Sequence, residues 1–267
     1  MSNFKLNKKE KYIFATDLDG TFLSEYNCGM SINNYKAVNK IKEAGHHFIL
    51  CTGRSWWWTK MIYEQLELTD PTIHFSGALT HNTSDLDVKI YRNNIPKEVV
   101  KNLVKELNLL EHVVEFIVNG RKKQAQFTLG DDIDDLFFNA YEVIFQLKHG
   151  NKHEELIKII EKKLGEKYLI RVWTQSTSTK NIDCVISPAE TNKSVGLESI
   201  AKQLKIPQKN VIYFGDNIND IEALEWAGMS YVMKNGIKEA KDVADEVLLL
   251  NNNEAGVAKK IIELLDE

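Results

Sequence analysis

The sequence of 267 residues contains little of what marks membrane, secreted or disordered proteins. None of its apolar runs approaches the ~20 residues that a bilayer-spanning helix needs. Only 4 Pro and 14 Gly are present, which argues against a long linker or a low-complexity segment. Residues 1–11 are rich in lysine but lack the apolar stretch of a signal peptide, so we expect a cytoplasmic protein.

The cysteines and the charge balance exclude further classes. Cys28, Cys51 and Cys184 are an odd number without the spacing of a metal or redox motif, so no disulfide framework is expected. Cys51 ends an apolar run and is interpreted as a small buried residue. The formal net charge of -4 argues against nucleic acid or a membrane as a partner, and we expect a monomer or a weak homodimer.

Both ends of the sequence alternate short apolar runs with amphipathic segments. Strands are predicted at 12–16, 47–51, 72–75, 211–214, 230–233 and 246–249. Helices are predicted at 33–44, 57–66, 194–204, 218–227, 237–243 and 255–265. Continuous apolar strands separated by helices are typical of a parallel sheet covered on both faces. The predicted fold is a three-layer α/β sandwich formed by residues 1–83 and 185–267.

The section from 84 to 184 has a different character, with more alternating strands and more charged helices. Helices are predicted at 97–107 and 154–164, and strands at 113–118, 124–129 and 168–174. The dipeptide Asn119-Gly120 favours a tight hairpin between the first two of these strands. We therefore predict that residues 84–184 form a separate α+β domain inserted into the α/β one.

Four polar clusters lie at the ends of predicted strands or at the start of a helix. They are Asp17-Leu18-Asp19-Gly20-Thr21, Thr52-Gly53-Arg54, Lys193, and the segment 215–220. In parallel sheets, ligands bind outside the carboxyl ends of the strands. Asp17 and Asp216 offer the hard oxygen ligands that Mg²⁺ prefers, and Thr52 and Lys193 offer a hydrogen bond and a positive charge to phosphoryl oxygens. The clusters together indicate a divalent cation and a phosphate.

These motifs resemble those of the haloacid dehalogenase (HAD) superfamily of aspartate-nucleophile phosphatases, and within it the Cof-like subfamily with a type C2B cap. The resemblance rests on D-x-D-G-T at 17–21, the strand-end Thr52, Lys193, and G-D-x-x-N-D at 215–220, in that order. It implies a HAD-like, Rossmannoid core and a magnesium-dependent phosphatase. It also implies that the inserted section 84–184 is a cap that closes over the site and selects the substrate.

The resemblance assigns the reacting and metal-binding groups. It implies that Asp17 attacks phosphorus and becomes an aspartyl phosphate. Asp19 is implied to be the general acid and base of the reaction. The implied ligands of Mg²⁺ are the Asp17 carboxylate, the Asp19 backbone carbonyl and Asp216.

The phosphoryl-binding residues follow from the same resemblance. Thr52, Gly53, Lys193 and Asn219 match positions that contact the phosphoryl group. Asp220 is implied to support the site, either by orienting Lys193 or by reaching the water molecules on the metal.

Two positions depart from the family pattern. Ser76-Gly77-Ala78 stands where Asn-Gly-Ala is usual, which bears on a substrate contact and leaves the nucleophile and the metal untouched. Ser194 follows Lys193 where Gly is usual, and because a helix starts as easily on Ser, Lys193 keeps its role.

The expected function is hydrolysis of a small phosphorylated metabolite, such as a sugar phosphate, a nucleotide or a cofactor phosphate. One alternative is a phosphotransferase or phosphomutase on the same scaffold, in which a sugar hydroxyl replaces water. Another is a non-catalytic phosphosugar sensor, against which the intact Asp19 argues.

Trp56, Trp57 and Trp58 are the most unusual local feature. Three consecutive helical residues cannot share one buried face, so at least one is expected to face solvent or the cap. We interpret them as packing residues, with an aromatic shelf for a substrate ring as the alternative.

Overall fold

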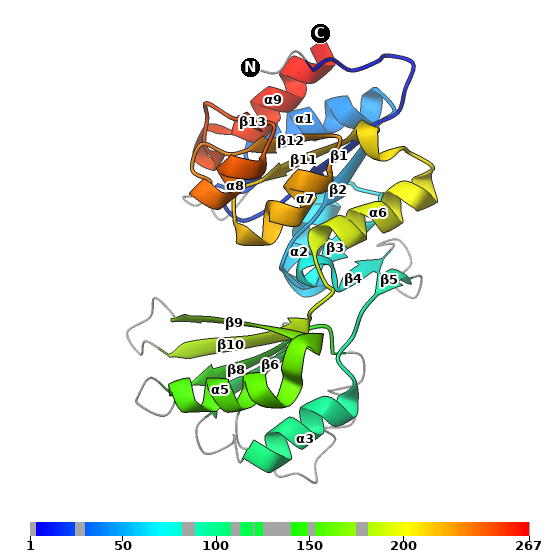
Figure 1. Ribbon diagram of the computed structural model, residues 1–267. Helices are drawn as coiled ribbons and strands as arrows, with labels where there is room; N and C mark the ends of the chain where they lie inside the picture. Colours follow the sequence, from blue (N-terminus) through cyan, green and yellow to red (C-terminus); the bar gives the residue numbers. More distant parts are fainter. Residues whose placement is uncertain are drawn as a thin grey trace. The chain divides into compact units, whose positions relative to one another are not determined.

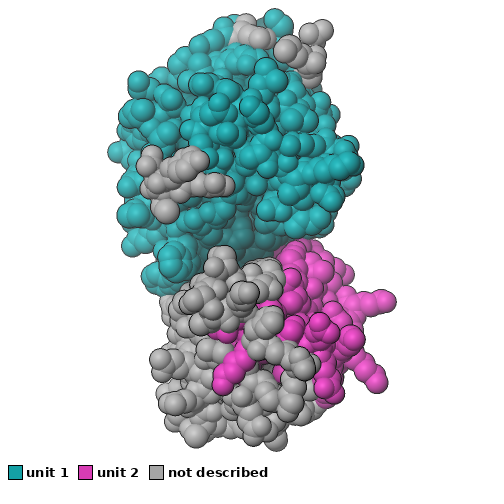
Figure 2. Space-filling view, turned by 90° about the vertical axis from the view of Figure 1, so that its left-hand side faces the viewer, with its two compact units in different colours: residues 1–91, 192–267 teal, residues 92–191 magenta. Residues whose placement is uncertain are grey.

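The computed structural model describes residues 4–24, 30–81, 89–107, 113–119, 121–124, 140–148, 153–174 and 181–266. The chain divides into two compact units (Figures 1 and 2). One comprises Met1–Tyr91 and Asn192–Glu267, and the other comprises Arg92–Thr191. Both divisions fall later in the chain than the predicted 83/84 and 184/185 boundaries. The roles of catalytic core and cap for these units stay predictions.

The first unit is built on a five-stranded sheet in the order β13-β12-β11-β1-β2. Its strands are β1 (Ile13–Thr16), β2 (His47–Leu50), β11 (Val211–Gly215), β12 (Met229–Val232) and β13 (Glu246–Val247). All neighbouring strands in it are parallel. β1 lies between β2 and β11, so the carboxyl ends of β1 and β11 are adjacent.

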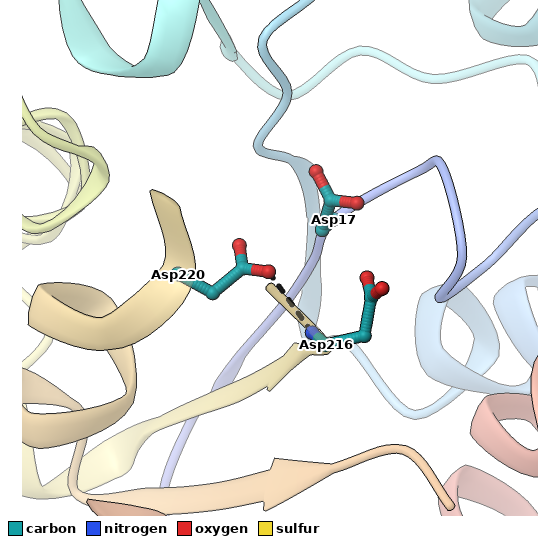
Figure 3. A group of neighbouring side chains, drawn as sticks. All are labelled: Asp17, Asp216 and Asp220. Atoms are coloured by element: carbon teal, nitrogen blue, oxygen red, sulfur yellow. Dashed lines mark hydrogen bonds between the residues drawn. The ribbon is translucent and has the colours of Figure 1, made fainter. Parts of the chain in front are cut away.

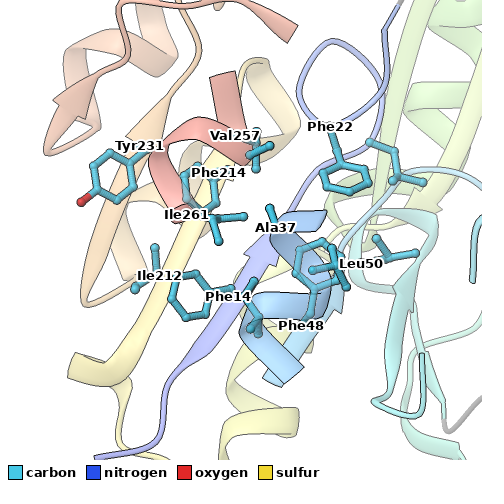
Figure 4. Packing of buried hydrophobic residues seen from close by; sticks show 14 of the residues in the cluster. Phe14, Phe22, Ala37, Phe48, Leu50, Ile212, Phe214, Tyr231, Val257 and Ile261 are labelled. Carbon is cyan, nitrogen blue, oxygen red and sulfur yellow. The ribbon is translucent and has the colours of Figure 1, made fainter. Parts of the chain in front are cut away.

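Helices cover both faces of this sheet. Side chains alternate along each strand, so each apolar strand contributes to a hydrophobic core on both faces. Phe14 and Phe214 pack in the core with α1 and α9 (Figure 4). Ile13 and Tyr213 pack in a second core with α6, α7 and α8, helices that Figure 1 labels. The helices are α1 (Ile32–Glu43), α2 (Trp56–Gln65), α6 (Lys193–Leu204), α7 (Ile221–Trp226), α8 (Lys238–Val243) and α9 (Gly256–Asp266). The predicted three-layer α/β sandwich is confirmed.

The third predicted strand has a different pairing from the one expected. β3 (Thr72–His74) meets the end of β2 through an isolated parallel bridge between Cys51 and Ile73. It then pairs antiparallel with β4 (Leu79–His81), which is followed in the same sheet by β5 (Lys89–Arg92). The chain reverses at Ser76 and Gly77, whose φ angles of 52° and 108° turn it back along β3. Most of β5 therefore belongs to the first unit and not to the inserted one.

The inserted unit contains an antiparallel sheet in the order β7-β6-β8-β10-β9. Its strands are β6 (Val113–Val118), β7 (Arg121–Gln124), β8 (Val143–Leu147), β9 (Tyr168–Thr174) and β10 (Ile182–Pro188). Helices α3 (Lys97–Leu107) and α5 (His153–Leu164) share one hydrophobic core with these strands. This arrangement confirms the α+β character expected of the section.

The inserted unit differs from the sequence predictions at three points. The hairpin at Asn119 is present, but its second strand is β7 at Arg121–Gln124, and residues 125–129 lie outside the described residues. β8 was missed altogether. The predicted boundary at 184/185 falls inside β10, which pairs along its length with β9.

In the part of the chain that is described, no helix has the length and apolar character needed to cross a bilayer.

Candidate active site

Three carboxylates meet where β1 and β11 end. Asp17 follows the last residue of β1, and Asp216 follows the last residue of β11. Because these strands are parallel neighbours, both side chains emerge at the same edge of the sheet, and the Asp17 N–H donates to the Phe214 carbonyl at 2.9 Å. Among the described residues, Asp17, Asp216 and Asp220 form a group whose candidate ligand oxygens all lie within 4.8 Å of one another (Figure 3).

Lys193 is the cation of this site. It opens α6, its side chain is 0% exposed, and its Nζ lies 2.6 Å from Asp17 Oδ1 and 2.5 Å from Asp220 Oδ1. The preceding residue, Asn192, caps the helix by accepting the Val195 N–H. Burial by itself lowers the pKa of Lys193, but the charges of Asp17 and Asp220 outweigh it and raise that pKa above its usual range. Lys193 is therefore a permanent ammonium group against the predicted nucleophile.

Asp220 has all of its acceptor positions filled. Its Oδ1 accepts from Lys193 Nζ and, at 2.6 Å, from the Tyr213 hydroxyl. Its Oδ2 accepts from the backbone N–H groups of Asp216 and Asn217 at 2.9 and 3.0 Å. A carboxylate offers about four lone-pair positions, and these four bonds use them. These bonds place Asp220 directly against Lys193, as the first of its two predicted roles requires, and its role in the site stays a prediction.

The loop between Asp17 and Thr21 is shaped around Asp216. Thr21 Oγ1 donates to Asp216 Oδ1 at 2.6 Å. Gly20 has φ +81°, and a Cβ there would lie only 2.4 Å from Asp216 Oδ2, so any other residue would be strained and would displace the Asp216 carboxylate. Asn235 Nδ2 donates to the Gly20 carbonyl at 2.8 Å and holds the loop from the other side.

The electrostatics of the site call for a further cation. Burial raises the pKa of Asp17, and although Lys193 opposes that shift, Asp220 adds to it. Burial also raises the pKa of Asp216 to about 6, against the hydrogen bond from Thr21. Among the described residues of this site, three buried carboxylates face one ammonium group, so a divalent cation bound by the oxygens of Asp17 and Asp216 would relieve the excess negative charge.

Asp19 lies apart from this group. Its side chain is 59% exposed, and both of its oxygens bind the guanidinium of Arg54, at 2.7 Å from Nε and 2.5 Å from Nη2. The Arg54 N–H donates in turn to Thr52 Oγ1 at 3.0 Å. Asp19 is thus connected by an ion pair to Arg54, which lies in the predicted cluster Thr52-Gly53-Arg54. This pair was not predicted from the sequence.

Of the predicted phosphoryl-binding residues, Thr52, Gly53 and Asn219 lie on two segments that approach each other at Gly53, whereas Lys193 opens α6. A Cβ added to Gly53 would lie 3.3 Å from Ser76 Oγ and 3.8 Å from Asn219 Nδ2. The Ser76 hydroxyl and the Asn219 amide therefore lie beside the position that a side chain at residue 53 would occupy. Thr52 is 1% exposed, and although its oxygen accepts from Arg54, its O–H proton is available to a ligand. The structure brings Thr52, Gly53 and Asn219 together as predicted, with Ser76 beside them.

The three tryptophans separate into two kinds. Trp56 packs edge-on against the rings of Tyr63 and His81, with ring centroids 5.6 and 5.5 Å apart. Trp57 and Trp58 are 58% and 62% exposed, in agreement with the expectation that at least one of the three is not buried. The aromatic shelf for a substrate ring stays a hypothesis about those two residues.

Sequence reasoning assigned no role to Arg54, Thr21 or Tyr213. Arg54 and Thr21 lie inside two of the predicted polar clusters, so their polar side chains already indicated a place in the site. Tyr213 lies in the otherwise apolar strand β11, and a buried phenol usually finds a hydrogen-bond partner, so a polar contact could have been expected there as well.

Cys51 is buried as expected, and burial raises its pKa above the usual range.

Comparison with known proteins identifies the family. A family profile described as haloacid dehalogenase-like hydrolase matches residues 14–261. The 5-amino-6-(5-phospho-D-ribitylamino)uracil phosphatase YitU of Bacillus subtilis is 31% identical over 267 residues, covering 94% of this chain and 97% of the relative. YbjI of Escherichia coli, a phosphatase of the same name, is 25% identical and covers 95% and 96%. The chain is a phosphatase, a hydrolase of phosphoric monoesters. It belongs to the haloacid dehalogenase-like hydrolase family, as its motifs predicted.

Solved structures agree on the fold. TM0651 from Thermotoga maritima superposes with a TM-score of 0.79 at 21% identity, covering 95% of this chain and 97% of that one. The phosphatase BT1666 from Bacteroides thetaiotaomicron gives 0.76 at 19% identity, covering 96% and 95%. At these identities the likeness concerns the fold alone.

Proposed function

We propose that this phosphatase hydrolyses a small phosphorylated metabolite through an aspartyl phosphate on Asp17. The observation that carries the proposal is the buried Lys193 Nζ, 2.6 Å from Asp17 Oδ1 and fixed on its other side by Asp220. An ammonium group held there also neutralises an oxygen of a phosphoryl group that becomes bonded to Asp17. The O–H of Thr52 and the amide of Asn219 are the proposed donors to the other phosphoryl oxygens.

The reaction has two halves. In the first, an Asp17 carboxylate oxygen forms a bond to phosphorus while the bond from phosphorus to the leaving oxygen breaks, and Asp19, which enters this half in its protonated form, gives that oxygen its proton. In the second, water attacks phosphorus, Asp19 takes a proton from the water, and the bond from phosphorus to the Asp17 oxygen breaks. The products are an alcohol and inorganic phosphate, and both aspartates return to their starting forms.

The carboxylates of Asp17 and Asp216 fit Mg²⁺. Both are buried hard oxygen donors with raised pKa values, which indicates a site built to hold more positive charge than Lys193 brings. When bound, Mg²⁺ would supply positive charge to the carboxylates and to the phosphoryl group. The backbone carbonyl of Asp19 is the proposed third protein ligand, and Asp220 is not proposed as one because its acceptor positions are filled.

The names of the relatives indicate which phosphate esters to test first, whereas the residues of the site indicate only that a phosphate ester is bound. YitU and YbjI carry the name of a phosphatase that acts on 5-amino-6-(5-phospho-D-ribitylamino)uracil. That ester therefore heads our proposed panel, followed by sugar phosphates, nucleotides and cofactor phosphates. We propose that the inserted unit selects among them, because contacts remote from the reacting bond distinguish only substrates large enough to reach them.

The test is release of inorganic phosphate from this panel with Mg²⁺ and without any added acceptor. Asp17→Asn is the matched control, because an amide has nearly the same shape and is a poor nucleophile. We expect free phosphate from the wild-type enzyme, none from the variant, and a phosphoryl group on Asp17 in acid-quenched wild-type enzyme analysed by mass spectrometry. Turnover by Asp17→Asn near the wild-type rate would overturn the proposal. Phosphate transfer only in the presence of a sugar acceptor would identify a phosphotransferase instead.

A further inference from the structure

We propose that Tyr213 is a positioning residue, whose hydroxyl holds Asp220 and through it sets the place of Lys193 beside Asp17. The proposal rests on the proposed function for the role of Lys193 in phosphoryl transfer. Tyr213 lies on β11, two residues before its end, and its side chain is fully buried. Its hydroxyl donates to Asp220 Oδ1 at 2.6 Å, and the same oxygen accepts from Lys193 Nζ at 2.5 Å.

The two oxygens of Asp220 are held in different ways. Oδ2 is fixed by two backbone N–H groups, those of Asp216 and Asn217, which belong to the turn after β11. With Oδ2 anchored, the carboxylate still has freedom to swing Oδ1. The Tyr213 hydroxyl removes that freedom, because it is carried by a rigid ring on a central strand of the sheet. The position of Oδ1 then decides where the Lys193 ammonium rests.

The hydroxyl also balances a competition for Lys193. Asp17 and Asp220 share one fully buried ammonium group, and each attracts it strongly. By donating to Asp220, Tyr213 satisfies part of that carboxylate's demand for positive partners. Without this bond, Asp220 would draw Lys193 Nζ toward itself and away from Asp17, where the phosphoryl group is transferred.

Packing does not account for the hydroxyl. The ring of Tyr213 lies in the core that also contains Ile49 and Leu197, and a phenylalanine ring would fill the same volume. The oxygen is the atom that distinguishes the two side chains, and it touches the site. The expected defect of its removal is therefore in catalysis more than in stability.

The experiment compares Tyr213→Phe with Tyr231→Phe, which removes the hydroxyl of a second fully buried tyrosine, on the neighbouring strand β12. Tyr231 packs in the core on the other face of the sheet, with Phe214. With p-nitrophenyl phosphate and Mg²⁺, we expect kcat of Tyr213→Phe to fall about tenfold or more, since a hydrogen bond to a charged group is lost. KM of that variant and both constants of Tyr231→Phe should stay within about twofold of wild type.

Two further measurements make the test specific. Combined with Asp220→Asn, Tyr213→Phe should have little additional effect, because the two residues act as one unit. A crystal structure of Tyr213→Phe should show Lys193 Nζ farther from Asp17 Oδ1 than 2.6 Å. The proposal is overturned if Tyr213→Phe has the wild-type kcat, if its effect on kcat is fully additive with that of Asp220→Asn, or if Lys193 Nζ has not moved. A Tyr213→Phe protein that fails to fold overturns it as well. If the wild-type enzyme releases no phosphate, the proposed function fails, while the position of Nζ still decides the role of Tyr213.

Discussion

The guanidinium of Arg54 binds both carboxylate oxygens of Asp19, with Nε 2.7 Å from Oδ2 and Nη2 2.5 Å from Oδ1. A two-point pair of this kind fixes the orientation of a carboxylate as well as its position. Arg54 is itself held, since its N–H donates to Thr52 Oγ1 and its carbonyl accepts from His74 Nδ1 at 3.1 Å. Burial lowers the pKa of His74 to about 3, so this ring is neutral, with its proton on Nδ1. The proposed acid and base is thus tied to the phosphoryl-binding loop.

Replacing Arg54 should change how the enzyme responds to the leaving group. In Arg54→Gln, Asp19 loses its two-point support, so alkyl phosphates, whose leaving oxygen needs a proton, should suffer most. We expect the ratio of kcat/KM for p-nitrophenyl phosphate to kcat/KM for an alkyl phosphate to rise by about tenfold or more. Thermal stability should change little, because the pair is partly exposed.

The matched control for Arg54 is Lys238→Gln, which breaks an exposed ion pair with Asp242 on α8. It should leave the leaving-group ratio at the wild-type value. Arg54→Lys is informative as well, since a single ammonium cannot bind both oxygens as a fork does. An unchanged ratio in both Arg54 variants would remove Arg54 from the support of Asp19.

Removing the metal should abolish turnover. We expect EDTA to eliminate phosphate release, Mg²⁺ to restore it, and Ca²⁺ to inhibit it, because Ca²⁺ accepts a higher and looser coordination that ties up the Asp17 carboxylate. Asp216→Asn should raise the Mg²⁺ concentration needed for half-maximal activity by about tenfold or more. Asp242→Asn, an exposed carboxylate on α8, is the control that should not. Full activity in chelator would contradict the proposed role of Asp216.

Gly77 should be intolerant of a side chain for two separable reasons. Its φ of +108° disfavours other residues, and an added Cβ would lie 2.0 Å from the carbonyl oxygen of Asn192, which caps the helix that carries Lys193. Gly45 has φ +75° and nothing within 4 Å of an added Cβ. We expect Gly45→Ala to lower the free energy of unfolding by about 1 kcal/mol, the backbone cost alone.

Gly77→Ala should lower the free energy of unfolding further and should also reduce kcat, since the start of α6 must move and Lys193 moves with it. Urea unfolding and steady-state kinetics on both variants measure the two effects. Equal stability of the two variants would show that the contact at Asn192 relaxes without cost.

Asp216 should make the stability of the metal-free protein depend on pH. Burial raises its pKa from 3.8 to about 6, against the hydrogen bond from Thr21. Because the pKa is higher in the folded state, the folded protein holds more protons across this range. This contribution to stability is complete below pH 3.8 and is lost as the pH rises through about 6.

In EDTA, the free energy of unfolding of the wild-type protein should therefore fall more steeply with rising pH across that range than that of Asp216→Asn. Chemical unfolding of both proteins at intervals over the range is the measurement. Parallel curves would mean that Asp216 titrates alike in the folded and unfolded protein.

The parts that the sequence predicted correctly are those encoded locally. A continuous apolar run that stops at Asp17 marks a buried strand whose end carries a polar group, and the same holds for the run before Asp216. The helix opened by Lys193 is equally local, with Asn192 as its cap. Motif order then sufficed to identify the family and the candidate nucleophile, because each motif lies at the end of one element.

What the sequence could not decide depends on neighbours that are distant in the chain. β3 reads as another apolar strand, and its antiparallel pairing with β4 is set by the turn at Ser76 and Gly77. Periodicity describes the faces of a strand but not its partner. No strand was predicted at β5, and residues 84–91 were placed in the inserted domain, whereas the chain divides between Tyr91 and Arg92.

By itself, the sequence determined the fold class and the family and singled out Asp17 and Asp216 as candidate site residues, since these follow from residue types at short spacing. The tertiary structure alone decided the partners of each group. Lys193 meets Asp17 across 176 positions of sequence, and Arg54 meets Asp19 across 35. It also decided which groups surround Asp220, since only the packed sheet brings Lys193, the Tyr213 hydroxyl and two backbone N–H groups to its oxygens. Hydrogen bonds depend on positions fixed to within a few tenths of an ångström, and that precision arises only when the strands have packed.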